Sequence, residues 1–219
     1  MSYSIQRTLL LVATGVVMVG CASTIPLTPD AAKTLTNREV TVARRDQPSF
    51  WPMSHEKLAL GLLHHGFLIV AGDELVAQNK IDDPAKYIGQ QLSQDLAARY
   101  DTTVASNPVK LADDDVEAIA KNHPTADLLL EVRTTFWGFM YYTADTDRHR
   151  VNYAAQLRLI DVKGGRIFAE GSCSRRTEEA PSAPTYDELV ANNAERLKGE
   201  LRGLADLCVG EFKTKVFQM

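Results

Sequence analysis

The chain has 219 residues and carries 24 Lys and Arg against 28 Asp and Glu, so its formal charge at pH 7 is −4. A net acidic protein is poorly suited to bind a polyanion, which argues against nucleic acid as a partner. Hydrophobic residues make up 45% of the chain, and no internal repeats or low-complexity tracts are visible. We therefore expect one well-filled domain rather than two.

The N-terminus has the layout of a secretory signal. Arg7 is followed by an apolar run from Leu9 to Val19 that ends on Gly20 and Cys21. This run of eleven residues is shorter than the roughly 20 that a permanent membrane-spanning helix needs. The chain is therefore expected to be exported.

Met18-Val19-Gly20-Cys21 resembles the lipobox of bacterial lipoproteins. The resemblance implies that a signal peptide, residues 1–20, is removed and that the thiol of Cys21 carries a thioether-linked lipid. Each buried methylene contributes about 0.8 kcal/mol, so a multiply acylated Cys21 anchors the chain durably. Ala22 in place of Asp resembles the sorting pattern of outer-membrane lipoproteins and implies the periplasmic face of that membrane. An ordinary cleaved secretory signal and a retained membrane helix are the alternatives.

Beyond the signal, residues 21–36 hold the lipidated cysteine and a small, polar segment with two prolines, which predicts a flexible tether. The single folded domain is expected over residues 37–219. A short strand is predicted at Glu39–Ala43, where β-branched residues alternate. It is followed by a loop, residues 44–53, with two aromatic side chains.

Three helices and one further strand are expected in the first half. Leu58–Gly66 is predicted as a helix and Phe67–Val70 as a buried strand. Asp83-Pro84 supplies an N-cap and a first-turn proline for a clearer helix that ends at Tyr100. A short helix is expected at Asp113–Asn122, where acidic residues suit the positive end of the helix dipole.

The second half is predicted to be a β-meander. Its strands are expected at Ala126–Tyr142, Val151–Val162 and Arg166–Arg176, with a tight turn at Lys163-Gly164-Gly165. Side chains alternate along all three, so the sheet should have one apolar and one polar face. The polar side chains that share the second face are Glu131, Arg133, Gln156, Arg158 and Glu170. They form either a ligand groove or an exposed surface stabilised by cross-strand charge pairs.

A long C-terminal helix is predicted to cover the apolar face. Thr185 and Glu188 form a Thr-x-x-Glu capping box at its start. The stripe expected to be buried along one side consists of Leu189, Asn193, Leu197, Leu201, Leu204, Cys208 and Phe212. The predicted fold class is therefore α+β, with an antiparallel or mixed sheet, a C-terminal meander and helices on one face.

The three cysteines fit an exported chain. If Cys21 is lipidated, Cys173 and Cys208 are left as an even pair in an oxidising compartment. Cys173 is predicted on the apolar strand face and Cys208 on the buried helix face, so both should point into the same interlayer space. A disulfide between them is the first interpretation, and two buried free thiols are the alternative.

Few residues indicate chemistry. His64-His65 is a histidine pair, but adjacent residues point in different directions, so no metal site is expected. The acidic runs Asp82-Asp83 and Asp113–Asp115 lack the spacing of a calcium loop and are predicted to start helices. The phosphate-loop, dinucleotide-binding and nucleophile-elbow patterns are absent. We expect no catalytic residues, no metal and no cofactor.

The aromatic segment Phe136–Tyr142 is the most unusual stretch, because alternation places aromatic side chains on both faces of a strand end. Trp137, Phe139 and Tyr141 are predicted as a partner surface or membrane-interface surface. The alternative is a strand end that is buried on both sides by helices and by the loop that carries Trp51.

The region Ala126–Phe212 resembles a group of uncharacterised proteobacterial outer-membrane lipoproteins through three motifs. These are Ala-Asp-Leu-Leu-Leu-Glu-Val-Arg-Thr-Thr-x-Trp-Gly, Leu-Arg-Leu-Ile-Asp-x-Lys-Gly-Gly and Tyr-Asp-Glu-Leu. The order of elements is distantly similar to the periplasmic α/β domain of curli-secretion-type envelope lipoproteins, without their membrane-inserting hairpin. The motifs are structural and imply no activity. Our first hypothesis is a non-catalytic envelope assembly or interaction module with a protein partner. A periplasmic module that binds a small ligand or lipid is the alternative.

Overall fold

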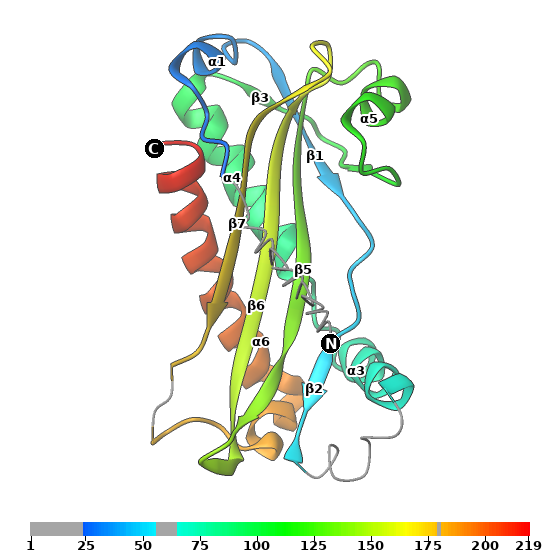
Figure 1. Cartoon of the computed structure of the whole chain (residues 1–219), viewed down its shortest axis with the longest axis vertical. Coiled ribbons are helices and arrows are strands. Elements are labelled where there is room, and N and C mark those ends of the chain that lie inside the picture. The colour runs from blue at the N-terminus through cyan, green and yellow to red at the C-terminus, as the bar shows by residue number, and fades with distance from the viewer. Residues whose placement is uncertain (1–23, 56–64, 179–180) are drawn as a thin grey trace, which may run out of the picture.

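The computed structural model describes residues 24–55, 65–178 and 181–219 (Figure 1). Within them, the strands form one seven-stranded mixed sheet. Its centre is the predicted meander of β5 (Leu128–Tyr142), β6 (Asp145–Asp161) and β7 (Arg166–Arg176), which pair antiparallel. Strands β1 (Glu39–Arg44) and β2 (Trp51–Met53) pair in parallel with successive parts of β5.

Two short strands, β3 (Thr103–Val104) and β4 (Val109–Lys110), pair in parallel with β1 and leave the sheet open. The described helices are α1 (Pro29–Lys33), α3 (His65–Asn79), α4 (Pro84–Tyr100), α5 (Val116–Asn122) and α6 (Tyr186–Glu211), which continues into the π-helical turn η1 (Phe212–Val216). Helices α4 and α6 contact each other and cover one face of the sheet (Figure 1). This arrangement confirms the α+β fold class. None of the described helices is long and apolar enough to cross a membrane.

Helix α4 begins and ends where the sequence predicts. The Asp83 side chain accepts a hydrogen bond of 2.9 Å from the backbone N–H of Ala85, and Pro84 stands in the first turn. Asp101 adopts a left-handed conformation with φ 54°, which ends the helix. The apolar side chains that α4 buries against the sheet are Ala85, Ile88, Leu92 and Leu96.

Helix α6 has the predicted capping box but is not continuous. The N–H of Glu188 donates to the Thr185 hydroxyl at 3.2 Å, and the N–H of Thr185 donates to the Glu188 carboxylate at 2.8 Å. Asn192, Asn193 and Ala194 then adopt left-handed φ values of 51°, 60° and 55°. This break shifts the helical register, so Ala194 is buried and Asn193 is exposed. The predicted stripe is therefore wrong at Asn193.

The hydrophobic core lies mainly between the sheet and the pair of helices α4 and α6. A second, smaller cluster lies on the opposite face, where Ile119 of α5 packs with Leu129 and Ile160. Its buried members are Ala43, Leu111, Ile119, Ala126, Leu129, Ile160 and Val162. The face predicted to be polar is therefore partly covered, because β5 and β6 carry apolar residues on both sides at this end.

The strand predicted at Phe67–Val70 is wrong, because these residues lie inside α3. A short apolar run fits a buried strand or a buried helix equally well. Here the apolar pattern continues through Leu75 and Val76, and the longer run forms a helix. Most of the helix predicted at Leu58–Gly66 lies outside the described residues.

The segment before β1 is part of the folded domain, so the flexible tether predicted over residues 21–36 is wrong from residue 24 onward. Ile25 exchanges two backbone hydrogen bonds of 2.8 Å with Glu170 of β7. The N–H of Leu27 donates to a carbonyl of η1 at 2.7 Å. Leu27 and Leu35 are 2% and 0% exposed in the main core. The composition of this segment did not predict the docking, because two buried side chains, Leu27 and Leu35, are enough to fix an otherwise polar segment.

Replacing Leu27 with Ala should lower the free energy of unfolding by about 2 to 5 kcal/mol, because a buried leucine leaves a cavity in a packed core. Thr36→Ala, at an exposed position of the same segment, is the matched control and should change it by less than about 0.5 kcal/mol. Urea unfolding followed by circular dichroism measures both values. Equal, near-zero effects would show that the segment is a tether after all.

Candidate functional site

Some predicted site residues lie outside the described residues. These are Cys21, the signal peptide over residues 1–20, and His64. Lipidation and membrane anchoring therefore stay predictions. Across the described ranges, no three or more His, Cys, Asp and Glu side chains are grouped to hold a metal ion.

Cys173 of β7 and Cys208 of α6 are joined by a disulfide, with their Cα atoms 5.6 Å apart. Both are buried between the sheet and the helix layer, where the strand and helix patterns predict them. The bond ties α6 to the edge strand of the sheet. Of the two interpretations of this cysteine pair, the structure contains the first.

Replacing both cysteines with Ala should lower the free energy of unfolding by roughly 3 to 4 kcal/mol, because the bridge restrains the unfolded chain. The two residues are separated by 35 positions in sequence. Dithiothreitol should destabilise the wild type by a similar amount and leave the double variant unchanged. A wild type whose unfolding midpoint is the same with and without reductant would contradict the bridge.

Two of the three residues predicted as a partner surface belong to the core. Trp137 and Phe139 are 0% and 1% exposed, and Tyr141 is half-buried. The indole N–H of Trp137 donates to the carbonyl of Pro48 at 2.8 Å, and the Phe50 ring packs edge-on against it at 5.1 Å. The prediction is wrong at Trp137 and Phe139, because the loop before β2 covers this end of β5.

The charged residues of the other sheet face form a closed network rather than an open groove. Glu131 is 1% exposed, and its carboxylate pairs with Arg45 and, at 2.6 Å, with Arg158. Asp114, which precedes α5, pairs with Arg45 at 3.1 Å and with Arg133 at 2.6 Å. These two guanidinium groups, Arg45 foremost, lower the pKa of Asp114. The network joins the residue after β1, strands β5 and β6, and the segment before α5.

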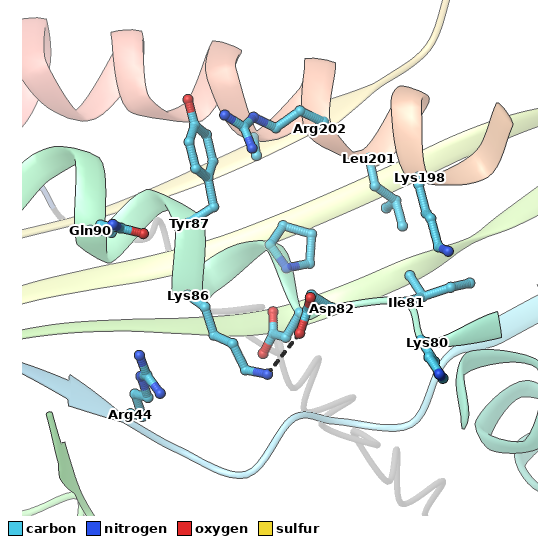
Figure 2. A pocket seen from close by; sticks show the side chains of 13 residues that line it. Arg44, Lys80, Ile81, Asp82, Lys86, Tyr87, Gln90, Lys198, Leu201 and Arg202 are labelled. Carbon is cyan, nitrogen blue, oxygen red and sulfur yellow. Dashed lines mark hydrogen bonds and ion pairs between the residues drawn. The ribbon is translucent and has the colours of Figure 1, made fainter. Parts of the chain in front are cut away.

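The candidate site is a cleft of about 530 Å³ between the start of α4, the turn at residues 80–83 and the middle of α6 (Figure 2). Its apolar lining comes from Ile81, Leu201 and Ala205. Its charged side chains are the cations Arg44, Lys80, Lys86, Lys198 and Arg202 and the carboxylates Asp82 and Asp83. Positive groups outnumber negative ones five to two at this site, although the chain is acidic overall.

Two of the cleft cations are engaged with neighbouring side chains. Lys86 pairs with Asp82 at 3.1 Å, shown by the dashed line in Figure 2. The Arg202 guanidinium lies over the Tyr87 ring, 3.2 Å from its centre. The Tyr87 hydroxyl donates to Asp206 at 2.6 Å, and this hydrogen bond raises the pKa of Tyr87. Arg202 and Tyr87 thus form one wall of the cleft.

The other three cations, Arg44, Lys80 and Lys198, form no ion pair with the residues that the structure describes. Arg44 and Lys80 are exposed, and neither has an acidic partner in the part of the chain that the structure describes. With the Asn193 amide oriented to satisfy both neighbours, its oxygen accepts from Lys198 Nζ at 3.2 Å. Its nitrogen then donates to the Asn79 carbonyl at 3.1 Å. The left-handed break in α6 therefore links this helix to the end of α3.

Lys80 occupies an unusual backbone position. The N–H of Ile81 donates to the Val76 carbonyl at 3.0 Å, and the N–H of Lys80 donates to the Ala77 carbonyl at 3.3 Å. These two bonds end α3 in a Schellman motif, where glycine is the usual residue at the left-handed position. Lys80 has φ 50°, a conformation that costs a residue with a β-carbon roughly 1 to 2 kcal/mol.

Asp83 is buried behind the cleft. It accepts hydrogen bonds from the N–H of Ala85 and from the hydroxyl of Thr134, which lies 3.2 Å from the Tyr153 hydroxyl. Burial raises the pKa of Asp83 and that of Tyr153, because both groups lose solvation of their charged forms. The Asp83 carboxylate therefore holds α4 to β5 rather than serving the cleft.

The raised pKa of Asp83 predicts the sign of a pH effect. The penalty for ionising Asp83 in the folded state is absent below the ordinary value of 3.8 and grows as pH rises through the shifted pKa. Asparagine also caps helices, so Asp83→Asn should gain stability relative to the wild type between about pH 4 and pH 7. Urea titrations at both pH values measure the difference, with Asp82→Asn as the control for removing one negative charge. A difference that shrinks as pH rises would contradict this assignment.

None of the five cleft cations was predicted as a site residue from the sequence. They come from β1, the turn after α3, α4 and α6, and no linear spacing connects them. The Asp82-Asp83 pair does fall in the cleft and starts a helix as predicted, but it gives no indication of the cations around it.

Comparison with known proteins gives only distant likenesses. No protein-family model and no curated protein matches the chain. The solved structures that match include bacterial lipoproteins. Lipoprotein GNA1162 from Neisseria meningitidis is 16% identical, with 81% of this chain and 99% of that chain covered and a TM-score of 0.32.

Two further solved structures match the chain, again with low sequence identity and low TM-score. The C-terminal domain of LpoB from Salmonella enterica is 13% identical, with 64% of this chain and 84% of that chain covered and a TM-score of 0.24. The hypothetical protein CT253 from Chlamydia trachomatis is 9% identical, with 84% and 100% covered and a TM-score of 0.42. These likenesses are too distant to transfer the role of any residue.

Proposed function

We propose that the chain is a non-catalytic lipoprotein, anchored through Cys21 at the periplasmic face of the outer membrane, whose domain is an envelope assembly or interaction module. The observation that carries the proposal is the short spacing between Cys21 and the folded domain. Because Ile25 is hydrogen-bonded to β7, four residue steps separate it from the anchor, a reach of at most about 14 Å. Such an anchor would keep the domain at the membrane surface, beside membrane-associated partners.

The cysteine usage supports an exported domain. Structural disulfides persist in oxidising compartments such as the bacterial periplasm, and the Cys173–Cys208 bond leaves Cys21 as the odd cysteine. The choice of outer over inner membrane depends on Ala22 alone.

The buried ionisable groups support a non-catalytic role. Glu131 is paired with two arginines, and Asp83 caps α4 while accepting from Thr134. Both carboxylates are therefore committed to holding elements together. Catalytic carboxylates, in contrast, need access to a substrate.

Cys21→Ala tests the anchor. Metabolic labelling with a palmitate analogue should label the wild type and the Cys173→Ala/Cys208→Ala control, but not Cys21→Ala, because only the Cys21 thiol forms the thioether. The wild type should fractionate with the outer membrane. Label retained by Cys21→Ala would disprove the anchor.

Cross-linking in the intact envelope tests the interaction role. The wild type should give a discrete adduct of higher mass, and Cys21→Ala should lose it, because the domain is no longer held beside its partner. A labelled, anchored wild type that stays monomeric after cross-linking would rule out the interaction module.

A periplasmic module that binds a small ligand or lipid is the second candidate function. The specific observation in its favour is the cation-lined cleft between α4 and α6, whose volume of about 530 Å³ lies within the range of small-molecule sites.

A further inference from the structure

We propose that the cleft between α4 and α6 binds a phosphate-bearing ligand. The proposal deepens the second candidate function, a ligand-binding module, and does not depend on the lipid anchor. Its basis is that Arg44, Lys80 and Lys198 line one cleft together with apolar side chains, with no ion-pair partner for the first two in the described part of the chain.

The cleft has more cations than carboxylates, and this excess of positive charge favours binding of an anion. Of its two carboxylates, Asp82 is paired with Lys86, and Asp83 is buried and hydrogen-bonded to Ala85 and Thr134. Neither is left to neutralise the cations at the rim. Cations that share one concave site repel each other, and an incoming anion relieves this repulsion.

The kind of cation and the apolar lining favour a phosphate group attached to a less polar moiety. A phosphate oxygen cluster accepts from several donors at once and matches both lysine point charges and the arginine fork. Figure 2 shows Arg44, Lys80 and Lys198 on three different segments that line the cleft, with Lys80 and Lys198 on one side of Lys86 and Arg44 on the other. Ile81 and Leu201 offer apolar contact for the remainder of the ligand.

Lys80 gives an independent indication. It stands at a left-handed position where glycine would fit the backbone without strain, and its side chain lines the cleft. Sites that retain strained residues are often functional. The backbone conformation of this turn favours glycine at position 80, whereas the proposed ligand binding explains why a lysine stands there.

Isothermal titration calorimetry tests the site on the protein extracted from whole cells with non-ionic detergent, which recovers the chain whether or not it is anchored. The probes are inorganic pyrophosphate, for a free phosphate compound, and glycerophosphoglycerol, for the headgroup of an anionic phospholipid. The wild type should bind at least one probe at low ionic strength. Binding of pyrophosphate alone indicates a free phosphate compound, and binding of glycerophosphoglycerol indicates a lipid headgroup.

Arg44→Glu/Lys80→Glu should weaken binding by about tenfold or more, because two charge-assisted contacts become repulsive. The matched control is Arg176→Glu/Lys121→Glu, which reverses one exposed arginine and one exposed lysine outside the cleft and should weaken binding less than about twofold. No binding of either probe, or an equal loss in the control, would overturn the proposal.

Lys80→Gly separates binding from folding. This variant should bind more weakly, while its unfolding midpoint should stay equal or rise, because glycine relieves the left-handed strain. Undiminished binding by Lys80→Gly would also overturn the proposal. The titration does not measure lipidation, so failure of the site and failure of the anchor are distinguishable.

Discussion

The covalent bond between Cys173 and Cys208 fixes the C-terminal helix to the edge strand of the sheet, and the functional features depend on where that helix lies. On the C-terminal side of this bond, the Val216 carbonyl of η1 accepts a hydrogen bond from the backbone N–H of Leu27. This contact docks the segment that follows Cys21. On the N-terminal side of the bond, α6 contributes Lys198 and Arg202 to the cleft. The placement of this helix therefore affects both how close the domain lies to its proposed anchor and how two of the five cations reach the proposed ligand site.

The parts of the fold that the sequence predicts are those with local signals. The Thr185 and Glu188 capping box starts α6, the Asp83 cap starts α4, and alternation defines the three meander strands. Where local patterns permit two structures, tertiary contacts decide. The apolar run at residues 67–70 becomes helix, and a polar N-terminal segment docks through two leucines.

The cleft could not be predicted, because its charge comes from residues that are distant in sequence. The formal charge of −4 argues against a polyanion partner for the whole chain, yet it carries no information on where cations gather. The aromatic prediction failed for a related reason. The contact between Trp137 and the Pro48 carbonyl joins segments 89 positions apart, and no pattern on the strand itself reveals that a loop covers it.

The most direct test of an exported, lipid-anchored domain is the intact mass of the protein extracted from whole cells with detergent and without reducing agent. Anchoring predicts a chain that begins at Cys21, carries the added mass of its acyl chains, and lacks the two hydrogens lost in the Cys173–Cys208 bond. The mass of an unmodified chain, whether it begins at Met1 or after a cleaved signal, would contradict it.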